Sequence, residues 1–208
     1  MIDFGIWIPA LLLYGLFMAW YNNWRGPLTP EEVKAFMAKA RAIGSDANNN
    51  LETIERFLSE DDGREFIMLN LVRVAPGMVD DPDTGKPTPG RELLNRYTSA
   101  FMRRLFMRGG HPALAARKIG GYVDAWHVEP DPGWTIMGYM RYRSRRDMAM
   151  LAIDTSFQDI HKFKIAGTAE TFSFPTRPII TLFIGPRVWV GMAIALVAAL
   201  ANLAVLAF

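Results

Sequence analysis

The feature that most constrains this chain is the absence of charged side chains from a long stretch near each end. From Phe4 to Trp24, and again from Val188 to Phe208, 21 consecutive positions hold no Asp, Glu, Lys or Arg. A helix needs about 20 mainly apolar residues to cross the hydrocarbon core of a bilayer, so both stretches are long enough. The sequence therefore predicts a transmembrane helix at each end of the chain.

Two other interpretations fit these stretches less well. A cleaved signal peptide would begin with a basic segment and end at a small-residue site, whereas this chain opens Met-Ile-Asp and has no convincing site. A helix at the edge of a small domain would have a polar face, whereas the C-terminal stretch is apolar all round. Aromatic rings favour the headgroup level, and the inner ends of the stretches carry Tyr21, Trp24 and Trp189. We therefore expect membrane-spanning segments within residues 1–25 and 179–208.

The distribution of charge predicts an orientation. All 23 Lys and Arg residues lie between Arg25 and Arg187, so the outer tails carry no basic residue. Basic residues gather on the cytoplasmic side of membrane proteins. We therefore expect a bacterial inner (plasma) membrane, with the middle of the chain in the cytoplasm and both termini outside. The net charge of +2 and the lack of a basic stripe with interleaved aromatic residues argue against nucleic acid as a partner.

Residues 26–63 are expected to form a helical neck between the membrane and the main domain. The sequence Thr-Pro-Glu-Glu at 29–32 supplies an N-cap, a proline at the first helical position and a capping box. This first helix should end near Gly44, and a second short helix should begin after Asn50.

Residues 64–178 alternate between β-rich and helical patterns. In chain order, the expected elements are strand 64–74, loop 75–90, helix 91–108, strand 113–127 with a kink at Gly120-Gly121, strand 134–144, a helical region 144–167 interrupted near Asp154-Thr155, and strand 170–175. This order, β-α-β-β-α-β, predicts an α+β domain of the ferredoxin-like type, flanked by the N- and C-terminal transmembrane helices.

Three segments of this domain resemble the dimeric α/β-barrel superfamily. They are FIMLNLVRV, RYTSAFMRR followed by GG, and MRYRSRRDM followed by DTSFQDIHKFK. The similarity is to a branch of unknown function related to antibiotic-biosynthesis and haem-degrading monooxygenases, although Arg143 and Thr155 replace two prolines typical of relatives. The resemblance implies a homodimer in which two four-stranded sheets pack into a barrel, with a small pocket between each sheet and its helices. Membrane spans are not typical of this superfamily.

The same resemblance nominates site residues. Asn70 on the first strand and His161 on the last helix match an asparagine and a histidine of the haem-degrading relatives, and Arg73 lies close to Asn70 in the sequence. Tyr142 stands where those relatives have a tryptophan. The resemblance thus implies Asn70, Tyr142 and His161 as catalytic residues, and His161, Asn70 and Arg73 as cofactor-binding residues. Haem is a possible cofactor by this resemblance, but the replacement of the tryptophan by Tyr142 leaves open that haem is bound without degradation or is not bound at all. No metal site of the protein's own is expected.

The residues themselves leave alternatives open. Helical periodicity puts Phe157, Ile160, His161, Lys164 and Ile165 on one face. A neutral imidazole there can ligate a metal, or it can be a core or dimer-interface histidine bonded to a backbone carbonyl. The Lys164 stem can carry its ammonium outward to water. The Asn70 amide can line a pocket, or it can satisfy a neighbouring backbone group.

Several other polar groups favour a solvated surface over a site. Asp124, Trp126 and His127 are expected at a hairpin end, and Arg143, Arg145 and Arg146 at a solvated helix start that could also attract an anion or lipid headgroups. The DDPDTG loop lacks the spacing of a calcium site. No phosphate-binding glycine motif, nucleophile elbow or zinc-binding histidine-glutamate motif is present.

Three functions remain after these exclusions. The first is a membrane-anchored module that binds a small apolar or aromatic molecule of the quinone, lipid or porphyrin type. The second is a monooxygenase- or isomerase-like enzyme with a pocket of Asn70, Tyr142 and His161. The third is a noncatalytic accessory subunit of a larger membrane complex. Gly191, Ala195 and Ala199 lie about one helical turn apart and would permit close helix packing in such a complex.

Overall fold

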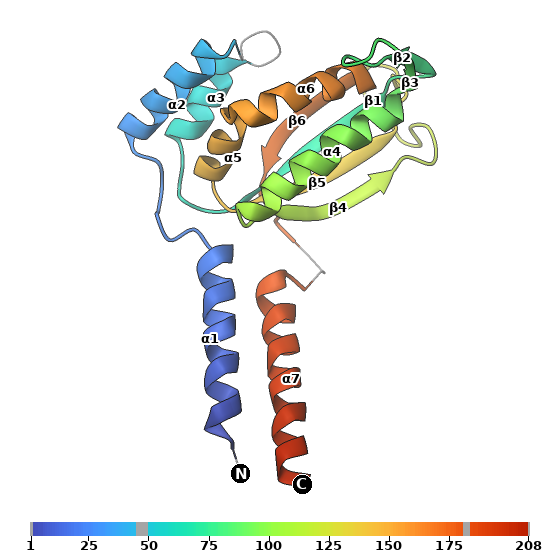
Figure 1. Cartoon of the computed structure of the whole chain (residues 1–208). Helices are drawn as coiled ribbons and strands as arrows, with labels where there is room; N and C mark the ends of the chain where they lie inside the picture. The colour runs from blue at the N-terminus through green and yellow to red at the C-terminus, as the bar shows by residue number, and fades with distance from the viewer. Residues whose placement is uncertain (1, 45–49, 181–183, 208) are drawn as a thin grey trace. The chain divides into compact units, whose positions relative to one another are not determined.

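The computed structural model describes residues 2–44, 50–180 and 184–207 (Figure 1). The chain divides into two compact units. One unit combines the two ends of the chain, Met1–Trp24 and Pro178–Phe208, and the other is Arg25–Arg177. Residues 26–63, expected to form a neck, therefore fold together with the main domain.

The terminal unit consists of two long helices, α1 (Phe4–Tyr21) and α7 (Pro186–Ala207). Both are long and apolar enough to cross a membrane, which is a statement about length and composition only. A core helix of a soluble protein can meet the same criterion, but such a helix is mostly buried. In this unit only Tyr21 and Ala198 are buried among the helical residues that the structure describes.

The two terminal helices run antiparallel and are joined by polar contacts near both ends. Arg187 Nε donates to Asn22 Oδ1 at 2.7 Å, and Tyr14 Oη donates to the Arg187 carbonyl at 2.9 Å. At the other end, the Asp3 backbone N–H donates to Asn202 Oδ1 at 2.7 Å.

Small residues of α7 permit its close packing against α1. Gly191 lies against the Tyr14 ring, where an added Cβ would come within 3.2 Å. Ala195 is exposed, however, and Ala198 is the buried alanine. The contact face therefore follows Gly191 and Ala198, seven residues apart, which is close to two turns of helix.

The larger unit has an antiparallel four-stranded sheet in the order β4-β5-β1-β6. Its strands are β1 (Phe66–Val74), β4 (His111–Arg117), β5 (Ile136–Tyr142) and β6 (Thr168–Thr176). Three helices cover one face of this sheet: α4 (Gly90–Met107), α5 (Arg145–Ala152) and α6 (Thr155–Gly167) (Figure 1). The predicted α+β class and the order β-α-β-β-α-β are both present, with the second helix in two pieces.

Two of the expected elements were wrong in detail. The loop at 75–90 contains a small hairpin, β2 (Met78–Asp80) with β3 (Pro87–Pro89). The strand expected at 113–127 begins at His111 and ends at Arg117. Its partner strand β5 begins at Ile136, opposite Arg117, and the Lys118 N–H still donates to the Thr135 carbonyl before the chain enters the loop.

The helix-covered face of the sheet carries the core. Phe66, Leu105, Tyr142 and Leu151 form its buried cluster, and Met68 packs against it. Successive residues of a strand point to opposite faces, so Asn70 shares this face with Phe66 and Met68. Alternate residues of β1, such as Leu69 and Leu71, face the uncovered side.

A second apolar cluster attaches the helices before the sheet, α2 (Pro30–Ala42) and α3 (Leu51–Ser59), to α5. Its buried members are Val33, Met37, Leu58 and Ala149. The predicted capping box is present at the start of α2, where Thr29 Oγ1 accepts from the Glu32 N–H and the Glu32 carboxylate accepts from the Thr29 N–H. The helix stops as expected, with Gly44 at a φ of +69°.

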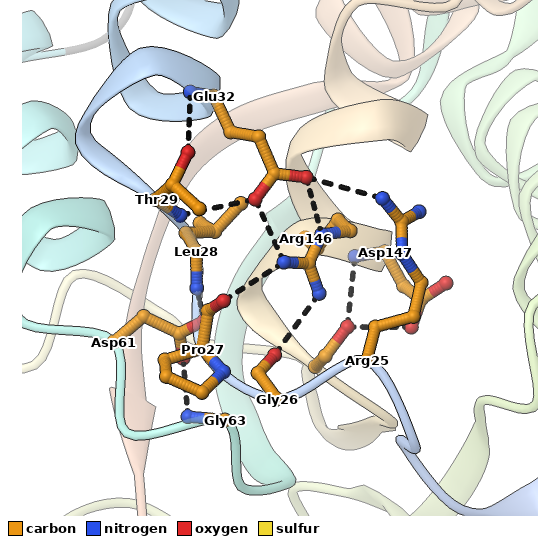
Figure 2. A network of polar contacts seen from close by, with 11 residues as sticks. Arg25, Gly26, Pro27, Leu28, Thr29, Glu32, Asp61, Gly63, Arg146 and Asp147 are labelled. Carbon is orange, nitrogen blue, oxygen red and sulfur yellow. Dashed lines mark hydrogen bonds and ion pairs between the residues drawn. The ribbon is translucent and has the colours of Figure 1, made fainter.

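Arg146 at the start of α5 completes this attachment (Figure 2). Its guanidinium donates to both carboxylate oxygens of Glu32, at 2.9 and 2.8 Å, and to the carbonyls of Gly26 and Pro27, at 3.0 and 2.9 Å. Only 5% of the Arg146 side chain is exposed. The helix start is therefore not the solvated one expected from its three arginines: Arg143 pairs with Asp147, and Arg145 pairs with Asp61.

Candidate functional site

A row of small side chains crosses the middle of the helix-covered face. Gly138 lies directly opposite Asn70 on β5, Ser173 lies opposite it on β6, and Ala115 on β4 extends the row. Opposed residues of an antiparallel pair point to the same face. In this row Gly138 is buried, whereas Ser173 and Ala115 on the edge strands are exposed. Two residues before Asn70, on the same face of the sheet, the side chains are large: Met68 of β1 lies opposite Met140 of β5.

Tyr142 contributes a phenol to the same face. Its ring stacks on Phe66 with centroids 5.2 Å apart and planes at 6°. Burial, followed by the neighbouring Tyr97, raises the pKa of Tyr142 above its usual range, so the phenol stays protonated and can donate a hydrogen bond. The hydroxyl makes no hydrogen bond within the described residues, yet every fully buried polar side-chain atom of those residues has a partner. The Tyr142 hydroxyl must therefore border space that water can enter.

The other polar groups come from α4 and α6, which approach each other closely. A Cβ on Gly167 would lie 2.7 Å from the Gly90 carbonyl oxygen and 2.8 Å from the Leu94 backbone nitrogen. Only glycine permits this approach of the C-terminal end of α6 to the N-terminal end of α4. Further along the contact between α4 and α6, the rings of Tyr97 and His161 have their centroids 5.6 Å apart and are tilted by 32°.

Lys164 lies one turn beyond His161 on α6. Its Nζ is 5.7 Å from the centroid of the Tyr97 ring, within reach of a cation–π interaction. Burial lowers the pKa of Lys164. Burial and the nearby Lys164 also lower the pKa of His161, which favours a neutral imidazole. The half-buried Lys164 side chain therefore lies against the Tyr97 ring.

The sheet separates the residues nominated by the sequence. Asn70, Tyr142 and His161 lie on the helix-covered side. The Asn70 amide nitrogen donates to the Met68 carbonyl at 3.1 Å and the Gly138 carbonyl at 3.4 Å, so it satisfies backbone groups. Arg73 points to the opposite side, where it pairs with Glu170 at 2.6 Å. The side chain of Phe157, expected beside His161, lies outside the described residues.

Sequence reasoning missed Tyr97 as a member of this group. Within the helix expected at 91–108, a tyrosine spaced with Leu94, Phe101 and Leu105 is typical of a core position, and nothing else in the sequence singles it out. The signal for Lys164 was present, since it shares a helical face with His161. That signal was outweighed by the general rule that lysine stems extend to water.

Other candidate places carry less chemistry. A hollow of about 200 Å³ opens where the loop after β4 meets the sheet, and it is lined by Leu71, Lys118, Tyr122, Trp134, Ile136 and Met137. Asp124 and Trp126 pair with each other on an exposed loop, as expected of a hairpin end. In the DDPDTG loop the Asp81 carboxylate accepts from the N–H groups of Asp83 and Thr84 and from Arg96. Within the described ranges, no cluster of three or more His, Asp or Glu residues could hold a metal ion.

No protein-family model matches this chain, and no curated protein sequence compared with it matches either. Two solved structures are similar in fold. One is the crystal structure of RPA0582, a protein of unknown function from Rhodopseudomonas palustris, with 20% identity and a TM-score of 0.53, covering 64% of this chain and 97% of that one. The other is methylated RPA0582, with 21% identity and a TM-score of 0.53, covering 65% of this chain and 96% of that one. At this identity the likeness establishes the α+β fold alone.

Proposed function

We propose that this protein is a membrane-anchored binding module that holds a small apolar or aromatic molecule between its sheet and helices α4 and α6. The observation that carries the proposal is the group formed by Tyr97, Tyr142, His161 and Lys164 in largely apolar surroundings. Such a mixture, mostly aromatic walls with a few polar atoms, is what small-molecule sites share. Perturbed pKa values of His161 and Lys164 add to it, because they gather at functional sites.

Each side chain would have a distinct part in binding. The protonated Tyr142 phenol donates a hydrogen bond to a carbonyl or hydroxyl of the molecule. The neutral His161 imidazole accepts or donates one, and the Tyr97 ring forms a wall. The small row at Asn70, Gly138 and Ser173 gives a planar molecule room against the sheet. A porphyrin belongs to this ligand class, because His161 supplies an imidazole of the kind that binds haem iron.

The ends of the chain support the anchoring half of the proposal. α1 and α7 would span the membrane, and the excess of basic residues between them would keep the Arg25–Arg177 unit on the cytoplasmic side. A tether of this kind keeps the site close to molecules that partition into the bilayer, such as quinones. Reporter enzymes fused to each terminus test the topology. A reporter that works only outside the cytoplasm should be active at both termini, and one that works only in the cytoplasm should be inactive at both.

Ligand binding tests the site itself. The full chain in lipid nanodiscs is titrated with menadione and with haem, with empty nanodiscs as background. We expect saturable binding of at least one of them, weakened about 2- to 10-fold in Tyr142→Phe, which removes one hydrogen bond. The exposed His127→Ala variant is the matched control for His161→Ala. Absence of saturable binding, or equal binding by all variants, would refute the site. Chemical conversion of the bound menadione or haem would favour the enzyme.

A second copy of the chain is the partner that we propose for the uncovered face of the sheet. Two rows of this face are wholly apolar: Leu114, Tyr139, Leu69 and Phe174 in one, and Ala116, Met137, Leu71 and Phe172 in the other. Phe172 and Phe174 are each more than 40% exposed in the single chain. An apolar patch of this extent is typical of an association surface. Each copy would bury its apolar rows against those of the other copy.

Light scattering of the chain in detergent micelles tests this partner. The protein mass should be that of two chains for the wild type and of one chain for Phe174→Asp. The fully exposed Val123→Asp on the loop after β4 is the control and should leave the mass unchanged. A wild-type chain of single mass would exclude the dimer.

A further inference from the structure

Lys164, which is half-buried, differs from the other cations that the larger unit holds wholly or partly out of water. Arg141, Arg145 and Arg146 each lie against a carboxylate, those of Glu65, Asp61 and Glu32 respectively. Lys164 has no Asp or Glu within ion-pair distance in the part of the chain that the structure describes. Its neighbours with titratable groups are Tyr97 from α4 and His161 from its own helix. Neither supplies a negative charge at neutral pH.

The cation–π contact with Tyr97 orients the ammonium without neutralising it. Such a contact contributes less than an ion pair in the same surroundings. An ammonium drawn partly out of water without a counter-charge is less favourable than a solvated one, which is why burial lowers the pKa of Lys164. The ammonium is thus held beside Tyr97 of α4 without a carboxylate partner, so it can pair with an anion that does not belong to the chain.

From this geometry we infer that the bound molecule is an acid: an apolar or aromatic body that carries a carboxylate or another single negative charge, paired with Lys164 Nζ. The inference rests on the proposed binding site and adds the class of ligand. The body lies against Tyr97 and the small row of the sheet, and the anion restores the full charge of Lys164. His161, kept neutral, offers a hydrogen bond next to that ion pair.

Matched probes test the inference without knowledge of the natural ligand. The full chain in nanodiscs is titrated calorimetrically with 1-naphthoate and with 1-naphthamide, which differ in charge and hardly in shape. The wild type should bind naphthoate at least tenfold more tightly than naphthamide. Lys164→Met should lose that preference, with naphthamide affinity changed less than twofold. Lys164→Arg, which keeps the charge, should retain the preference for naphthoate.

Lys162→Met is the matched control on the same helix. Lys162 is exposed and pairs with Asp83 at the surface, so its removal should leave both affinities unchanged. A thermal melt of each variant confirms that it is folded before titration. Equal wild-type affinity for the two probes, or a preference that survives Lys164→Met, would overturn the acidic-ligand inference and leave the site standing. Failure of both probes to bind would overturn the site and, with it, the inference.

Discussion

Arg146 on α5 is buried and Lys164 on α6 is half-buried, and the surroundings of these two cations of the same domain are opposite. Arg146 donates four hydrogen bonds, two to a carboxylate and two to backbone carbonyls. Lys164 faces an aromatic ring. A cation whose donors are all occupied holds elements together, and one whose charge is uncompensated is available to something else. The contrast separates the part of the domain that builds the fold from the part that can act on a ligand.

The first prediction concerns the cation with all its partners. Arg146→Met should destabilise the protein by about 2 kcal/mol, because Glu32 and two carbonyls lose their donor; Glu32 is 27% exposed, which reduces the loss below that of a fully buried pair. The melting temperature of the full chain in nanodiscs should fall by roughly 4–8 °C. Arg25→Met removes the other, exposed partner of Glu32 and should cost less than about 0.5 kcal/mol.

Acid titration sharpens this prediction. Arg146 and the Thr29 N–H lower the pKa of Glu32 from 4.5 to about 2. A carboxyl with a depressed pKa in the folded state adds stability above pH 4.5, and that stability is lost as the pH falls toward 2. Arg146→Met should therefore show a weaker acid dependence over this window than the wild type. An identical acid dependence of stability in both proteins would show that Arg146 does not lower the pKa of Glu32.

The second prediction concerns the close approach that brings α4 and α6 together. Gly167→Ala should destabilise by about 1–3 kcal/mol, because the added methyl group meets backbone atoms of α4 that cannot yield easily. Gly120→Ala, which has no atom within 4 Å of its added Cβ, should be neutral. Melting curves of the two variants test the difference. If Gly167→Ala is as stable as Gly120→Ala, the approach of the two helices is looser than described.

The third prediction runs opposite to the first. Lys164→Met should leave the free energy of unfolding unchanged or raise it by up to about 1 kcal/mol, because an unpaired ammonium is replaced by an apolar chain of similar length. The folded-state pKa of Lys164 lies below the usual 10.5, so the wild type should gain stability as the pH rises toward 10.5. Lys164→Met should lack this gain. Denaturant titrations at neutral and alkaline pH measure both effects, and a clear loss of stability would assign Lys164 to the scaffold.

The smallest expected effect belongs to His161. Its pKa is lowered below 6.5 in the folded protein, so the wild type should lose a little stability as the pH falls below 6.5 toward that lower pKa. His161→Gln should flatten this dependence, and His127→Ala should keep it. The imidazole proton signals in NMR spectra give the pKa directly. A His161 pKa at or above 6.5 would contradict the burial described for its ring.

The sequence predicted most of the architecture for physical reasons that act locally. Strand β1 and helix α4 follow from hydrophobic periodicity, and the capping box at Thr29 follows from side-chain chemistry within four residues. The end of β4 could not be predicted, because it depends on where a strand from elsewhere in the chain begins. The α2–α5 attachment was missed for the same reason: Arg146 and Glu32 are 114 residues apart.

The candidate site was predicted in part. The resemblance placed Asn70, Tyr142 and His161, and the structure puts all three on one side of the sheet while Arg73 points to the other. Asn70 and Arg73 are close in the sequence but three positions apart, and residues an odd number of positions apart in a strand point to opposite faces of the sheet. Lys164 stands out because no carboxylate of the described residues lies within ion-pair distance of its ammonium. Sequence alone cannot supply that information.

Gly138 opposite Asn70 has a consequence for how such a site can change. An added Cβ there would meet only the flexible end of Met140, at 3.0 Å, so growth of this side chain would narrow the space against the sheet without touching any charged group. The charged side chain of the candidate site, Lys164, lies on α6, whereas the residue that would limit the thickness of a ligand, Gly138, lies on β5. One codon on each element would therefore alter acidity preference and ligand thickness separately, and a lineage could explore new ligands along two independent axes.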